Sequence, residues 1–89
     1  MKHLQIRIRG KVQGVCFRAG TERKAKELGL VGFVLNEEDG SVYVEAEGSP
    51  DALQALIKWC QSGPLLASVE GVEVHEGEVK GYEKFVQIR

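Results

Sequence analysis

The chain has 89 residues, 43% of them hydrophobic, and a formal net charge of −1 at pH 7, which fits one ordinary globular domain and leaves no room for a second module. No stretch is long and apolar enough to cross a bilayer, and the N-terminal residues lack the apolar core of a signal peptide, so we expect a cytoplasmic protein. In that compartment Cys16 and Cys60 are expected to be free thiols rather than a disulfide.

The charges are distributed unevenly along the chain. Residues 1–26 contain eight Lys and Arg and one acidic residue, a balance of +7, whereas residues 27–89 carry −8. Most of the basic side chains are expected on a solvated face. A second interpretation is a local positive field that attracts a small anion to the N-terminal part of the chain.

The first third of the chain predicts a strand, a glycine-containing loop and a helix. Apolar and polar residues alternate from His3 to Arg9, which is the period-2 pattern of a half-buried strand. Apolar residues recur at helical spacing from Arg18 to Leu28, and Gly29 stands where a left-handed residue would end that helix. The residues between these two elements form the connecting loop.

A β-hairpin is predicted next. Strands over Val31 to Asn36 and Val42 to Glu47 flank an acidic turn, in which Asp39-Gly40 supplies a residue with positive φ. The polar positions of this hairpin and of the first strand define a second sheet face, which we expect to be solvated. That face comprises His3, Gln5, Arg7, Arg9, Tyr43, Glu45 and Glu47.

The remaining elements are a helix and two strands. Ser49-Pro50 predicts the start of the helix, as cap and first helical residue, and Gly63 predicts its end. Strands are predicted over Val69 to His75, with a bulge where the alternation slips at Gly71, and over Phe85 to Arg89. This order predicts an α+β fold, a ferredoxin-like βαββαβ sandwich whose mostly antiparallel sheet has two helices on one face and a short fifth strand.

The loop from Gly10 to Arg18 has the features of an anion cradle. Its glycines permit positive φ, which allows successive N–H groups to point inward. Unpaired amides that lead into a helix N-terminus attract an anion, because they act together with the helix dipole. Arg18 adds a planar guanidinium able to hold two oxygens of a phosphate. The loop therefore predicts a phosphate or oxyanion site, although Arg18 is also compatible with a surface position at the helix start.

Asn36, at the end of the second predicted strand, is the other candidate. Its amide offers both a donor and an acceptor, which suits it to hold a water molecule. The plainer interpretation is a turn asparagine, because this residue is common in turns. Gln13 is expected to bond the backbone of its own loop.

Several kinds of chemistry lack candidate residues. Cys16 has no base partner, and the flanking Val15 and Phe17 favour its burial, so a catalytic thiol is not expected. His3 and His75 are isolated, with no carboxylate or cysteine at metal-ligand spacing, so we expect neither a metal site nor a cofactor. Any reaction at the loop is therefore predicted to proceed without a protein nucleophile.

Two motifs in the chain resemble the signatures of the acylphosphatase family. The first is Ile8 to Arg18, I-R-G-K-V-Q-G-V-C-F-R, and the second combines Gly32 to Asn36 with Asp39 to Val42. The similarity continues through Gly63-Pro64 to Ile88-Arg89, so that it spans nearly the whole chain. The fold of that family is the same βαββαβ sandwich.

The resemblance implies a metal-independent hydrolase that cleaves the carboxyl–phosphate bond of acyl phosphates to a carboxylate and inorganic phosphate. It implies that the phosphoryl oxygens are held by the Arg18 side chain and by loop N–H groups, those of Gly14, Val15, Cys16, Phe17 and Arg18. Asn36 would position the attacking water. The implied partners are a small acyl phosphate and the phosphate product, with no nucleic acid and no membrane, and a monomer is expected.

Two other functions share some of these features. RNA-recognition domains have the same topology, but they stack bases on aromatic residues of the first and third strands, where this chain offers only Tyr43. A regulatory domain that binds an anion without turning it over would need the loop and Arg18 but not a water-holding Asn36. A related alternative is the acylphosphatase-like domain at the head of larger maturation enzymes, against which the length of the chain argues.

Overall fold

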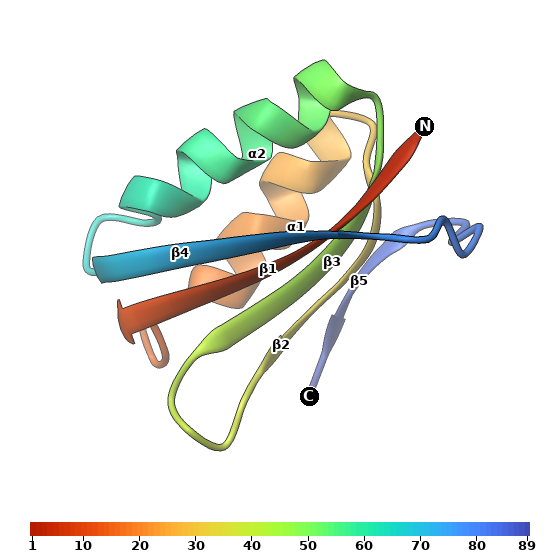
Figure 1. Ribbon diagram of the computed structural model, residues 1–89. Coiled ribbons are helices and arrows are strands. Elements are labelled where there is room, and N and C mark those ends of the chain that lie inside the picture. Colours follow the sequence, from red (N-terminus) through yellow and green to blue (C-terminus); the bar gives the residue numbers. More distant parts are fainter.

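Two helices lie on one face of a five-stranded sheet in the computed structural model, which describes residues 1–89 (Figure 1). The elements in chain order are β1 (Lys2–Lys11), α1 (Phe17–Glu27), β2 (Val31–Asn36), β3 (Val42–Gly48), α2 (Pro50–Ser62), β4 (Ser68–Gly77) and β5 (Phe85–Ile88). The strands are ordered β4-β1-β3-β2-β5, and all neighbours are antiparallel except β2 and β5, which are parallel. The predicted ferredoxin-like fold with a short fifth strand is confirmed.

The element boundaries follow the predictions with small shifts. β1 runs two residues beyond its predicted end, because Gly10 and Lys11 still pair with β4. The β1–β4 register shifts after Arg9 and leaves Glu70 as an extra residue on β4, which confirms the bulge expected beside Gly71. α1 begins at Phe17, one residue earlier than predicted.

The core lies between the helices and one face of the sheet. Alternation turns one set of apolar side chains toward the helices, among them Leu4, Ile6, Ile8, Val42, Val44 and Ala46, all of which are buried. Leu53, Leu56 and Cys60 of α2 are buried in the same core, and the half-buried Trp59 packs edge-on against Phe17 with ring centroids 5.4 Å apart. The core therefore anchors the residue at which α1 begins.

The opposite face of the sheet is solvated along only part of its length. His3 and Glu47 have no exposed surface, contrary to the prediction, because residues 80–82 fold over this end of the face. Glu47 accepts the backbone N–H groups of Lys80, Gly81 and Tyr82 and a hydrogen bond from the His3 ring at 2.7 Å. His3 thus has carboxylates near it in space, at Glu45 and Glu47, that the residue spacing along the chain did not indicate.

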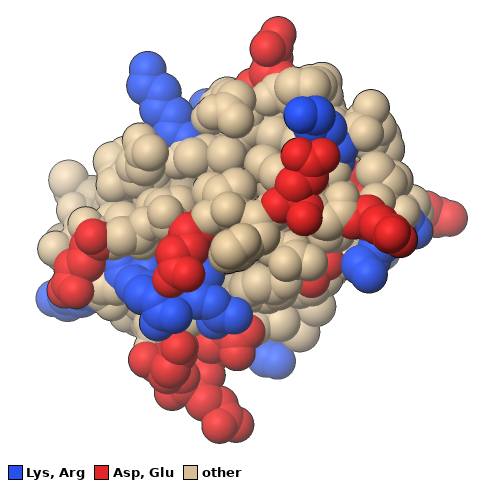
Figure 2. All heavy atoms as spheres, in the orientation of Figure 1, with Lys and Arg blue, Asp and Glu red and all other residues tan.

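Several basic residues of the N-terminal segment have acidic partners in space. Arg9 lies 2.9 Å from Glu73 and 3.4 Å from Asp39, and the Arg7 guanidinium lies 5.1 Å above the ring of Tyr43. Figure 2 shows basic side chains bordered by acidic ones on the face drawn there. The uneven charge along the chain is thus largely compensated in the folded protein, because antiparallel strands bring its two halves side by side.

Neither helix is both long and apolar enough to serve as a membrane span. Cys16 and Cys60 are both free thiols, as predicted. Burial raises the pKa of the Cys60 thiol to about 12, so that this cysteine is an inert part of the core at neutral pH.

Candidate active site

Alternating inward and outward residues shape the loop between β1 and α1. Val12, Val15 and Phe17 are buried and anchor the loop to the core, while Gly14 and Cys16 are exposed. The two exposed residues have positive φ, 75° at Gly14 and 66° at Cys16. The burial expected for Cys16 was wrong, because its left-handed backbone directs its side chain out between two buried neighbours.

The N–H groups of this loop have no partners within the protein. None of the N–H groups from Gly14 to Arg18 donates to a backbone or side-chain acceptor, and Cys16 caps α1 without a side-chain hydrogen bond. The first N–H groups of any helix lack intrahelical acceptors, and here the preceding loop adds further unpaired ones. Together they leave five consecutive donors unpaired beside the positive end of a helix dipole.

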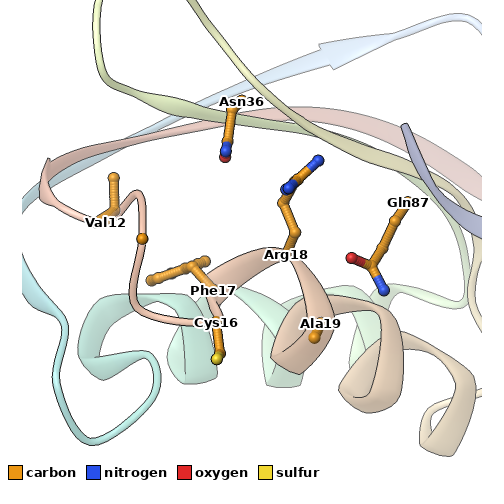
Figure 3. A pocket seen from close by; sticks show the side chains of 8 residues that line it. Val12, Cys16, Phe17, Arg18, Ala19, Asn36 and Gln87 are labelled. Atoms are coloured by element: carbon orange, nitrogen blue, oxygen red, sulfur yellow. The ribbon is translucent and has the colours of Figure 1, made fainter. Parts of the chain in front are cut away.

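Arg18 lies on the first turn of α1 and is held by the last strand. Its Nη1 donates to the carbonyl oxygen of Ile88 in β5 at 3.0 Å, and it forms no ion pair with an acidic residue. A guanidinium carries five N–H groups, so most of its donors stay available to an anion. The side chain points into the space below Asn36 (Figure 3).

Asn36 reaches the same space from the end of β2. Strand alternation puts it on the helix-facing side of the sheet, like the buried Val34 two residues earlier. Its amide points toward the loop, whereas the Cys16 thiol points away from it (Figure 3). The residues meet around a hollow of about 360 Å³, lined by Val12, Gly14, Cys16, Phe17, Arg18, Ala19, Asn36 and Gln87.

Gln87 is a member of this site that the sequence did not indicate. It lies on β5 with its side chain toward the helices, and its Nε2 donates to Glu22 Oε1 at 2.6 Å. The bonds from Gln87 and Lys26 keep the pKa of the Glu22 carboxyl below its ordinary value. Only the parallel pairing of β5 with β2 brings Gln87 beside Asn36, and nothing in the local sequence signals that pairing.

A second, more open hollow adjoins the first. Its volume is about 740 Å³, and Val86 is the one hydrophobic residue among those that line it. It shares Arg18, Asn36 and Gln87 with the smaller hollow, so the two form one continuous surface depression. A small anion seated on the loop therefore has space beside it for an attached group.

Gln13 makes contacts other than those expected. Its Nε2 donates to the carbonyl oxygens of Glu37 at 2.7 Å and Ser41 at 3.0 Å, in the turn between β2 and β3. The prediction that it serves its own loop was therefore wrong. The sequence separation of 24 and 28 residues leaves no local pattern from which these bonds could have been found.

The turn after Asn36 is internally braced. Asp39 Oδ1 accepts the N–H of Ser41 at 2.9 Å and its hydroxyl at 2.6 Å, and Arg7 donates to the same hydroxyl oxygen at 3.1 Å. These bonds from Ser41 keep the pKa of the Asp39 carboxyl below its ordinary value. The end of β2 is consequently a rigid support for Asn36.

The fold and the site define a class of protein. It is a small α+β protein with a ferredoxin-like sheet, in which a strand-to-helix loop presents unpaired amides and an arginine toward an asparagine on a neighbouring strand. This arrangement is suited to hold a tetrahedral oxyanion such as a phosphoryl group. The one thiol in the lining of the smaller hollow, that of Cys16, points away from Asn36 (Figure 3).

Comparisons with known proteins identify the family. The acylphosphatase family model matches residues 4–87. An acylphosphatase of Shewanella amazonensis is 50% identical over 78 residues, 88% of this chain and 86% of that protein. The crystal structure of acylphosphatase from Bacillus subtilis superposes with a TM-score of 0.97 at 32% identity and covers both chains completely. The chain belongs to the acylphosphatase family and is a hydrolase of that kind.

The chain is also similar to part of a larger protein. A structure of full-length HypF in a phosphate- and nucleotide-bound form matches 99% of this chain with a TM-score of 0.93 and 34% identity, but only 12% of the HypF chain is covered. The curated acylphosphatases that match, by contrast, are covered over most of their own length, 86% and 98% for the first two.

Proposed function

We propose that the chain hydrolyses acyl phosphates without a metal ion, in a site built from the β1–α1 loop, Arg18 and Asn36. Membership of the acylphosphatase family supports the reaction. The five unpaired N–H groups from Gly14 to Arg18 and the Arg18 guanidinium hold the phosphoryl oxygens. The Asn36 amide binds a water molecule and directs it toward phosphorus.

The proposed reaction is a single displacement at phosphorus. The water oxygen forms a bond to phosphorus while the bond from phosphorus to the carboxylate oxygen breaks, and the electron pair of that bond leaves with the carboxylate. One proton of the water passes to a phosphoryl oxygen, so that the products are a carboxylate and dihydrogen phosphate. Phosphoryl transfer of this kind requires mainly positioning and charge stabilisation, which this site supplies.

The run of unpaired amides is the observation that carries the proposal. The first N–H groups of any helix lack intrahelical acceptors, and here the loop adds those of Gly14, Val15 and Cys16, so that five unpaired donors in succession are suited to bind an anion. The carboxylate of an acyl phosphate is a good leaving group, and its departure needs no covalent intermediate. All groups of the proposed site come from one chain, so the proposed chemistry requires no residue from a partner subunit.

Two rival functions receive less support. Nucleic-acid binding would need a free aromatic face on β3, but the Tyr43 ring is stacked under Arg7 and its hydroxyl donates to Glu45 at 2.7 Å. A regulatory anion-binding domain would need the loop and Arg18 alone. The position of Asn36, with its amide directed into the same hollow, favours catalysis over binding alone.

Hydrolysis of benzoyl phosphate in the presence of EDTA tests the proposal. We expect turnover that EDTA leaves unchanged, and a fall in kcat of about a hundredfold or more in Asn36→Ala. Inorganic phosphate should inhibit both forms competitively with similar constants. Gln61→Ala, which removes an exposed amide on α2, is the matched control and should retain full activity. Phosphate binding without turnover in the wild-type protein would instead identify a regulatory domain.

A further inference from the structure

Gln13 makes the direct hydrogen-bonded connection between the anion loop and the hairpin that carries Asn36. Its side-chain amide has two N–H groups, and both are used, one on the carbonyl of Glu37 at 2.7 Å and one on the carbonyl of Ser41 at 3.0 Å. No other hydrogen bond joins residues 12–16 to residues 36–41. The side chain is partly buried, which strengthens both bonds.

The two carbonyl groups that Gln13 bonds are those that close the hairpin turn. Glu37 N–H donates to the Ser41 carbonyl at 2.9 Å, and Gly40 N–H donates to the Glu37 carbonyl at 3.2 Å. Gln13 therefore bonds the same two carbonyl oxygens that accept the hydrogen bonds of the turn. Glu37 directly follows Asn36, so one of the two Gln13 hydrogen bonds is made to the residue next to Asn36.

The phosphate-holding groups are anchored independently of Gln13. Val12, Val15 and Phe17 bury the loop in the core, and Arg18 is bonded to the Ile88 carbonyl. Loss of the Gln13 bonds would therefore leave the loop formed but free to shift relative to β2. A shift of that kind changes the distance between the bound phosphoryl group and the Asn36 amide without removing any phosphate contact.

We propose that Gln13 is a positioning residue for hydrolysis, which sets the separation between the phosphoryl group on the loop and the water on Asn36. The inference rests on the proposed roles of the loop and Asn36. In this role Gln13 affects kcat through the position of Asn36 and does not itself contact the substrate. A merely structural role would instead lower stability and weaken phosphate binding and turnover together.

Gln13→Met tests the proposal, because methionine matches glutamine in length and shape but donates no hydrogen bond. With benzoyl phosphate as substrate, we expect kcat to fall about ten- to a hundredfold, as for a small misplacement of reacting groups. The competitive inhibition constant of inorganic phosphate should stay within about twofold of the wild-type value. If the methionine variant does not fold, Gln13→Asn replaces it, because its side chain is one methylene shorter and cannot reach both carbonyls. It should likewise lower kcat and leave the phosphate inhibition constant nearly unchanged.

A double-mutant cycle with Asn36→Ala separates this proposal from the proposed function. If Gln13 acts through Asn36, then Gln13→Met should lower kcat much less in the Asn36→Ala background than in the wild type. Equal effects in both backgrounds would overturn the inference while leaving the role of Asn36 intact. Full activity of Asn36→Ala alone would overturn the role of Asn36, and the inference with it.

Glu47→Gln serves as the control for stability, because Glu47 lies at the opposite end of β3 from the turn. It should lower the melting temperature without lowering kcat at a temperature where the protein is folded. A kcat of Gln13→Met equal to that of the wild type would overturn the proposal. So would a parallel loss of kcat and phosphate affinity in that variant.

Discussion

Nδ1 of His3 lies 2.7 Å from a carboxylate oxygen of Glu47, and both side chains are completely buried. Burial alone would raise the pKa of Glu47, but the N–H groups of Lys80, Gly81 and Tyr82 and the His3 ring lower it by more, so its pKa lies below the ordinary value of 4.5. The buried carboxylate therefore stays charged near neutral pH. It ties the segment before β5 to the sheet.

Glu47→Gln should lower the free energy of unfolding by about 2 kcal/mol, because charge-assisted hydrogen bonds are lost and the new amide N–H groups face other donors. Urea unfolding at pH 7 measures this loss. Glu76→Gln is the matched control, since Glu76 is exposed and lies 3.9 Å from Lys2. It should leave stability nearly unchanged. Equal effects of the two substitutions would contradict the structural role of Glu47.

The stability difference between the wild type and Glu47→Gln should depend on pH. The folded protein lowers the pKa of Glu47 below its ordinary value of 4.5, so the unfolded chain binds the proton more readily. The stability that Glu47 contributes is present above that value and is lost as the pH falls through the folded pKa. Thermal unfolding of both proteins at a series of pH values from 7 to below 4.5 should show the stability difference between them becoming smaller as the pH falls. A difference that stays constant with pH would contradict a lowered pKa of Glu47 in the folded protein.

Arg18→Gln should abolish both turnover and phosphate affinity. The variant loses the only guanidinium that lines the smaller hollow, and an arginine that stabilises a phosphoryl transition state contributes about 10³-fold or more to the rate. Phosphate inhibition of the residual activity and equilibrium binding of phosphate measure the two effects. Arg23→Gln removes the same charge from an exposed position further along α1 and should behave like the wild type.

Cys16→Val should destabilise the protein more than Cys16→Asn does. A β-branched residue fits poorly at φ 66°, whereas asparagine adopts left-handed backbone conformations readily. The expected cost of the valine is about 1–2 kcal/mol, and it should also weaken phosphate binding because the loop amides turn away. Urea unfolding and phosphate titration test both effects. Equal stability of the two variants would exclude the left-handed conformation in solution.

Local sequence patterns were sufficient to predict the elements and to single out the loop and Asn36 as candidates. The alternation of apolar and polar residues predicted β1, and Asp39-Gly40 predicted the hairpin turn. Ser49 caps α2, as its position before Pro50 predicted, by accepting the Ala52 N–H. These signals work because they depend on residues close in sequence. The loop around Arg18 could be recognised for the same reason.

Contacts between distant segments escaped prediction. The burial of Glu47 depends on residues 80–82, which have no periodic pattern of their own and which bond Glu47 across 33 to 35 residues. The polar alternation of β1 and β3 describes which face a side chain occupies but not what later covers that face. The contacts of Gln13 and Gln87 were missed for the same physical reason.

The bond from Arg18 to the Ile88 carbonyl joins the start of α1 to the last strand across 70 residues. On the ribosome, α1, the hairpin and α2 are synthesised before β5, so the β1–α1 loop emerges long before the Ile88 carbonyl that accepts a hydrogen bond from Arg18. The candidate site on the growing chain therefore stays incomplete until β5, which supplies Gln87 and the Ile88 carbonyl, has left the exit tunnel.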